Sequence, residues 1–131
     1  MRGIRRSLWV AIAVDLAIAP LALLPVRPVA DALGIPIGEP VMYLRFAGLL
    51  FLVLPIFYFV GARDDRLSAP VAGAASFTRL AGVLFLVGHL VRGAPSAFWI
   101  FVAVEAIVGA LHVAALRGAG MTPWRALSSR P

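Results

Sequence analysis

The chain has 131 residues, of which 62% are hydrophobic and only 14% are charged. Soluble domains are about 45–50% apolar and about 25% charged, so the composition excludes an ordinary soluble enzyme and a disordered tail and indicates a single integral membrane domain. The net charge of +6 is typical of some nucleic-acid-binding proteins, but its arginines stand between apolar stretches and not along one stripe, so we expect no nucleic-acid partner.

The first apolar stretch runs from about residue 7 to residue 24. About 20 helical residues cross a hydrocarbon core about 30 Å thick, so this stretch predicts a membrane span. Pro25 and Pro28 end it, because proline cannot continue the helical hydrogen-bond ladder. A cleaved signal peptide is the competing interpretation, which the length of the run and Asp15 within it disfavour.

Residues 26–39 form the longest predicted loop. The segment Val29–Gly34 indicates a short interfacial turn of helix with Gly34 as its C-cap, and an irregular loop is the alternative.

Three further spans are predicted at about residues 41–61, 72–91 and 97–116. Pro40 suits the first turn of the second span, Pro70 the opening of the third, and Ser96 the N-cap of the fourth. The third span is apolar only from Phe77, so it reaches full length if the small residues from about position 72 are helical. The polar run of residues 63–66 predicts a loop, and residues 117–131 form a tail.

The arginines predict the orientation. Two of them lie in loops on the side opposite the N-terminus, Arg27 and Arg92, whereas eight lie on the side of the N-terminus. These eight are Arg2, Arg5, Arg6, Arg63, Arg66, Arg117, Arg125 and Arg130. By the positive-inside rule both termini are cytoplasmic, and the fold class is an all-α integral membrane four-helix bundle in a bacterial inner membrane.

The second and third spans share an internal echo. Residues 45–53 and 79–87 are identical at seven of nine positions, 34 residues apart. An inverted repeat and a chance match in an apolar alphabet are both consistent with this similarity. In both copies an arginine precedes a glycine by three residues, and we expect Gly48 or Gly82 to let a neighbouring backbone approach beside the arginine.

Small residues recur at every fourth position in the first and fourth spans, which is typical of closely packed helices. These positions are Ser7, Ala11, Asp15 and Ala19, and Ala106, Ala110, Ala114 and Gly118. Packing within one bundle and a homodimer face are the two interpretations.

Six ionisable residues lie within the spans: Asp15, Arg45, Arg79, His89, Glu105 and His112. Charges in the bilayer are costly, so they face the bundle interior and pair with one another. From the rise per residue, Arg45 and Arg79 both lie within reach of the two acids. We therefore expect a charge network of Asp15 and Glu105 against Arg45 and Arg79.

The two histidines lie too far apart for one metal ion, and the chain has no cysteine and no H-E-x-x-H motif, so we expect no metal site. Packing residues that form hydrogen bonds are the simpler interpretation of both. The chain has no nucleophile–base pair, phosphate loop or cofactor fingerprint, so no catalytic residue or cofactor is predicted.

The charge network has two interpretations. It is either a structural set of ion pairs that fixes the register of the helices, or a polar site in the membrane for a lipid, quinone or proton. The candidate ligand-binding residues are Asp15, Arg45, Arg79, His89 and Glu105.

Four segments carry a resemblance to a known family: Val29–Pro36, Tyr43–Gly48, Phe57–Asp64 and Arg79–Gly82. Over about residues 5–117 the chain resembles the small bacterial four-helix membrane proteins of the DoxX-like kind. The resemblance implies a membrane location and an accessory role in quinone or sulfur-redox complexes, although the lack of cysteine argues against thiol chemistry.

We therefore expect a non-catalytic accessory or small-ligand-binding membrane protein. The alternatives are a quinone- or lipid-binding redox subunit and a transporter or channel formed by a homo-oligomer.

Overall fold

The computed structural model describes residues 1–24, 27–32, 34, 37 and 42–128, and this part of the chain is helical without strands. Its helices are α1 (Arg2–Leu23), α2 (Arg27–Ala32), α3 (Met42–Arg63), α4 (Asp65–Leu90), the 3₁₀ turn η1 (Ser96–Phe98), α5 (Trp99–Gly118) and α6 (Pro123–Ser128). The expected all-α class is confirmed.

Four of these helices are long and apolar enough to cross a membrane: α1, α3, α4 and η1 with α5. Large side chains such as Ile56, Leu84 and Ile107 are at least 60% exposed on their outer faces. Such a surface is unfavourable in water and suggests a multi-pass membrane protein.

The short helical turn predicted after the first span is present as α2, although it begins two residues earlier than expected. Gly34 has a φ of +65° and its N–H donates to the carbonyl of Asp31. This left-handed conformation favours glycine, as expected for the end of a short helix.

The start of the third span was predicted wrongly. Residues 63–66 do not form a loop, because α3 ends at Arg63 and α4 begins at Asp65. Asp64 alone joins the two helices and caps α4, its carboxylate accepting from the N–H of Arg66 at 2.8 Å. Pro70 consequently lies inside α4 and does not open it.

The fourth span begins without the expected cap. Ser96 is the first residue of η1, and the N-cap of α5 is Phe98, which makes no side-chain capping hydrogen bond. The tail after α5 also contains structure that the sequence did not predict. Gly120, with a φ of +74°, turns the chain so that α6 packs against α4. There a Cβ on Gly73 would lie 2.8 Å from the carbonyl oxygen of Pro123, so only glycine permits this contact.

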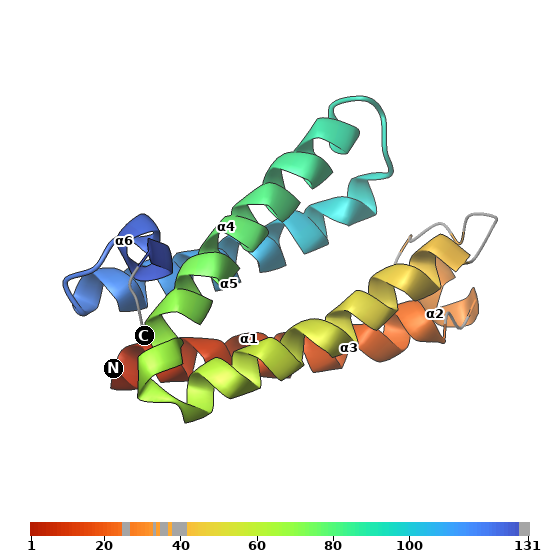
Figure 1. Cartoon of the computed structure of the whole chain (residues 1–131). Helices are drawn as coiled ribbons and strands as arrows, with labels where there is room; N and C mark the ends of the chain where they lie inside the picture. The colour runs from red at the N-terminus through yellow and green to blue at the C-terminus, as the bar shows by residue number, and fades with distance from the viewer. Residues whose placement is uncertain (25–26, 33, 35–36, 38–41, 129–131) are drawn as a thin grey trace.

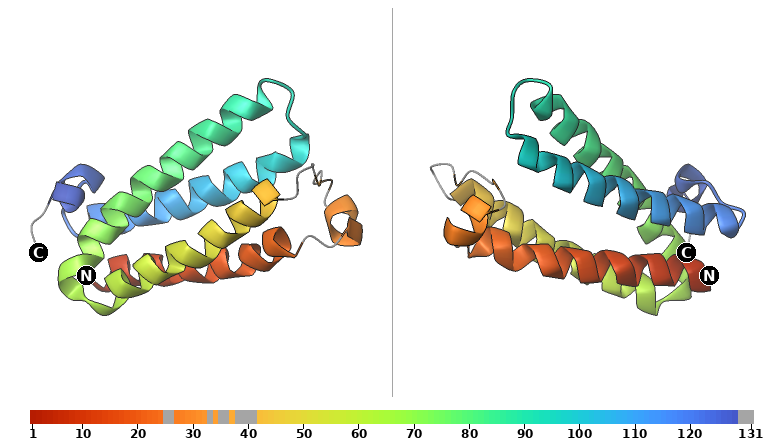
Figure 2. Two further views of the ribbon diagram at one scale, coloured as in Figure 1. Left: turned by 45° about the vertical axis from the view of Figure 1, so that its right-hand side comes forward. Right: turned by 180° about the vertical axis from the view of Figure 1, so that it is seen from behind.

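The long helices form two antiparallel pairs, α1 with α3 and α4 with α5, and α1 also contacts α4 and α5 (Figure 1). The pairs meet near the start of α1, and toward the opposite end α4 separates from α1 and α3 (Figure 2). The segment after α2 still contacts η1 there, since a Cβ on Gly34 would lie 3.7 Å from Cβ of Ala97. The first residues of α1 and helix α6 therefore lie at the same end of the molecule.

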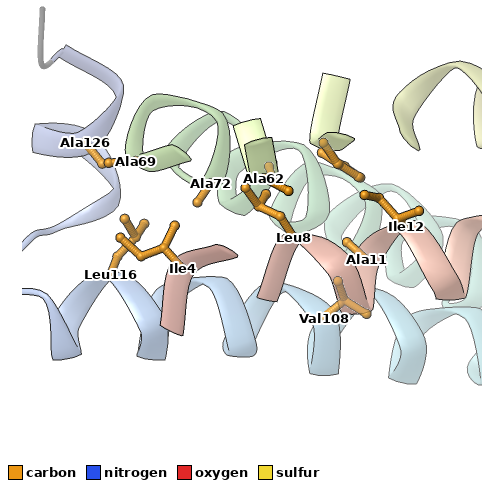
Figure 3. Packing of buried hydrophobic residues seen from close by; sticks show 12 residues of the cluster. Ile4, Leu8, Ala11, Ile12, Ala62, Ala69, Ala72, Val108, Leu116 and Ala126 are labelled. Carbon is orange, nitrogen blue, oxygen red and sulfur yellow. The ribbon is translucent and has the colours of Figure 1, made fainter. Parts of the chain in front are cut away.

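Large aliphatic side chains and alanines build the core where the two pairs meet (Figure 3). Ile4, Leu8 and Ala11 of α1 are fully buried there against Ala72 of α4 and Leu116 of α5. Arg5 ties the same end together, since its Nε donates to the Ala62 carbonyl at 2.7 Å. This tight end holds the helices in the register that brings the ionisable residues together.

Candidate functional site: a buried ionic cluster

Arg79 is the centre of a buried ionic cluster that joins three helices. Its Nη2 donates to both carboxylate oxygens of Asp15, at 2.6 and 2.7 Å, and its Nη1 donates to Oε1 of Glu105 at 2.8 Å. Asp15 is fully buried, and the side chains of Arg79 and Glu105 are 2% and 15% exposed. The predicted network of the two acids with Arg79 is confirmed.

Small residues let the three helices come close enough for these bonds. A Cβ on Gly109 of α5 would lie 3.1 Å from Cβ of Arg79, and one on Gly82 would lie 3.3 Å from Oε2 of Glu105. In α1 the whole predicted stripe around Asp15 faces inward, including Ala11 and Ala19, both fully buried. The stripe thus packs within the bundle.

The fourth member of the predicted network, Arg45, does not belong to it. Arg45 is exposed in the first turn of α3 and forms no ion pair with any residue in the described ranges. At 100° per residue it lies about 140° around α3 from the buried Tyr58. The axial position of Arg45 was suitable, but its direction around the helix was not.

His89 also lies apart from the cluster. It is exposed near the end of α4, where its ring meets the edge of Phe85 at a centroid distance of 4.5 Å. His89 therefore does not join Glu105, although both were candidate ligand-binding residues.

Three polar residues that the sequence analysis did not place in the cluster lie beside it. The Arg79 guanidinium carbon is 5.8 Å from the ring centroid of Tyr58, and the Tyr58 and His112 rings are 6.2 Å apart. Nδ1 of His112 lies 3.0 Å from Oγ of Ser7, so His112 is a hydrogen-bonded packing residue as expected. Ser7 was visible as part of the stripe around Asp15, and Tyr58 carried no signal beyond its place in an apolar span.

The cluster is not balanced in charge. Without Arg45, two carboxylates share one guanidinium, so full ionisation leaves one excess negative charge. Oε1 of Glu105 accepts from Arg79, and Oε2 receives no hydrogen bond from the described part of the chain. Glu105 is thus the member with a free acceptor and partial exposure.

Glu105 and Arg79 line a groove between α4 and α5 of about 170 Å³. Apart from Ser76 and these two residues its lining is apolar, and it includes Pro123 at the start of α6. The other lining residues are Phe77, Leu80, Val83, Ala106, Gly109, Ala110 and Val113. An apolar groove with a few polar groups is the usual form of a small-molecule site.

Within the described ranges, His, Asp and Glu residues form no group of three that could hold a metal ion. Comparisons of the chain with models of protein families, with curated proteins and with solved structures gave no match. The argument for function therefore rests on the geometry of the cluster and the groove.

Proposed function

We propose that the chain is a multi-pass protein of a bacterial inner membrane with both termini in the cytoplasm. Support comes from the four apolar helices and from the position of the start of α1 and of α6 at one end of the molecule (Figure 1). Arg45 lies at the opposite end with Arg27 and Arg92, so the arginine bias is eight to three. The bias still favours that orientation.

Within this membrane we infer a non-catalytic role, the binding of a small amphiphile in the groove between α4 and α5. The observation that carries this proposal is Glu105, which lines an apolar groove with one carboxylate oxygen unpaired among the described residues. Oε2 of Glu105 accepts no hydrogen bond from the described residues, and full ionisation of both acids leaves one excess negative charge, so the groove favours a head group that donates hydrogen bonds. A quinol, a hydroxyl-bearing lipid and an amine-bearing lipid have such groups.

The wider context stays a prediction. The resemblance to DoxX-like proteins favours an accessory subunit of a membrane complex, and a quinol in the groove would fit a redox complex. The residues of the site bind and orient a ligand in this proposal, and the chain itself performs no chemical step.

Native mass spectrometry of the protein released from its own membrane tests the proposal. We expect a retained lipid or quinone in the wild type and its loss in Glu105→Gln. That variant should fold, because the remaining Asp15–Arg79 pair is neutral. His89→Gln is the matched control, since His89 is exposed and lies outside the groove lining, and it should retain the ligand. A wild type that carries no ligand, or a Glu105→Gln protein that keeps it, would contradict the proposal.

A homo-oligomeric transporter or channel is the second candidate, and one observation favours it. The small residues of α5, unlike those of α1, face outward: Ala106, Ala110, Ala114 and Gly118 are all exposed. In lipid, faces of small residues permit close helix contacts. The same spectra measure stoichiometry, and a strict monomer would count against this candidate.

A further inference from the structure

Three deeply buried polar atoms form no hydrogen bond with the described residues: Oη of Tyr58, Nε of Arg79 and Nε2 of His112. They come from α3, α4 and α5, and each side chain is at most 3% exposed. The rings of Tyr58 and His112 lie 6.2 Å apart, and the guanidinium carbon of Arg79 lies 5.8 Å from the Tyr58 ring. Buried polar atoms are rarely left unpaired, so three in one place require an explanation.

The hydrogen bonds of Ser7 determine which nitrogen of His112 carries the proton. The Ser7 hydroxyl donates its single hydrogen to the carbonyl oxygen of Ile4 at 2.8 Å. Its contact of 3.0 Å with Nδ1 of His112 must then be one in which Ser7 accepts. Nδ1 of His112 is therefore protonated in the neutral ring, and Nε2 is a bare acceptor.

The donor and acceptor roles of Arg79 and Tyr58 are fixed as well. Nε of Arg79 can only donate, because a guanidinium has no acceptor atom. The Tyr58 hydroxyl both donates and accepts. The three unpaired atoms thus comprise a donor, a group that does both, and an acceptor, which is the set that one continuous chain of hydrogen bonds needs.

We propose that Tyr58, Arg79 and His112 form a buried binding site for water. In this site hydrogen bonds run in one direction: from Nε of Arg79 to the Tyr58 hydroxyl and from that hydroxyl to Nε2 of His112, with water between Tyr58 and His112, and on from Nδ1 of His112 through Ser7 to the carbonyl of Ile4. A water molecule can bridge buried polar groups that do not meet directly. Buried waters typically make about three such bonds to otherwise unsatisfied groups.

The site shares Arg79 with the groove, but Tyr58 and His112 do not line the groove, and the ligand class of the site follows from its donors and acceptors. An anion has no hydrogen to donate to Nε2, and a metal cation has no lone pair to accept from Nε of Arg79. A small neutral molecule that both donates and accepts, which is water, satisfies all three atoms. The inference does not depend on the occupant of the groove, so failure of either proposal leaves the other standing.

Nitrogen-15 NMR of the protein in lipid bilayers tests the site, in buffer alkaline enough to keep an ordinary histidine neutral, above about pH 7.5. The chain has two histidines, and the spectrum of His89→Gln assigns His112. We expect His112 as a single tautomer with its proton on Nδ1, and magnetisation transfer to its Nε2 from water protons. A proton on Nε2, rapid exchange between tautomers, or no transfer from water would overturn the proposal.

Two variants separate the site from the general packing of His112. Tyr58→Phe keeps the ring and removes only the hydroxyl, so we expect the Nε2 resonance to shift and the transfer from water to weaken. Ser7→Ala removes the acceptor at Nδ1, and we expect the tautomer preference to be lost. An unchanged Nε2 resonance in Tyr58→Phe would contradict the chain, and the measurements on the wild type decide the matter even where a variant does not fold.

Discussion

The segments of residues 45–53 and 79–87 are nearly identical in sequence, yet their shared residues do different work. Arg79 is buried and holds two carboxylates, whereas Arg45 is exposed and has no ion pair among the described residues. For the two glycines the order is opposite, because the first copy has the tighter contact. A Cβ on Gly48 would lie 2.8 Å from the backbone nitrogen of Leu23, whereas one on Gly82 would meet only the end of the Glu105 side chain.

The difference shows that the position of a segment in its helix, and not its local sequence, decides its role. Arg45 lies in the first turn of α3, where its side chain is exposed. Arg79 stands near the middle of α4, because that helix begins at Asp65. The two copies therefore have unlike surroundings in the structure, and an inverted repeat and a chance match both stay consistent with their similarity.

Among the variants that test this comparison, Arg79→Leu is expected to lose the most stability. Removing the guanidinium leaves two buried carboxylates without a partner, and breaking a buried ion pair in this way costs about 3–5 kcal/mol. Unfolding in mixed detergent micelles, followed by circular dichroism, measures the loss. The triple variant Arg79→Leu, Asp15→Asn, Glu105→Gln is the control. It should recover much of the stability, and equal instability of the two proteins would show that charge is not the cause.

An intermediate loss of stability is expected at the glycines, and here the first copy should be the more sensitive one. Gly48→Ala forces α1 and α3 apart, which we expect to cost about 1–3 kcal/mol, as overpacking typically does. Gly82→Ala should change the free energy of unfolding by less than about 1 kcal/mol, because the Glu105 carboxylate can move and alanine favours the helix. Gly88→Ala has no neighbour within 4 Å and sets the baseline. Equal losses at Gly48 and Gly82 would contradict the difference between the copies.

The sequence predicted the elements better than their junctions. The four long helices and the turn at α2 follow from hydropathy and proline positions, which are local signals. The start of α4 was predicted seven residues late, because Pro70 is a common first residue of helices and Asp64 is an equally good cap. Helix α6 was not predicted, since its position depends on a contact with Gly73, far away in the sequence.

The candidate site was predicted in part for the same reason. Burial cost alone indicated that Asp15, Arg79 and Glu105 would pair, because each lies deep in an apolar span. Depth along the helix could not show that Arg45 faces outward, since the side that faces the bundle depends on how the helices pack. Tyr58 was missed because an aromatic residue in an apolar span gives no sign that its hydroxyl lies beside an arginine.

The smallest effect is expected from Arg45→Leu, and it isolates the difference between the two arginines. Arg45 is exposed and has no ion pair among the described residues, so its loss should change the free energy of unfolding by no more than about 0.5 kcal/mol. The same unfolding experiment applies, with Arg79→Leu beside it, so that identical substitutions in matching sequence segments are compared directly. A loss at Arg45 close to that at Arg79 would mean that Arg45 also holds a buried acid. In that case the cluster would contain two arginines, its excess negative charge would disappear, and the case for a hydrogen-bond-donating ligand at Glu105 would weaken with it.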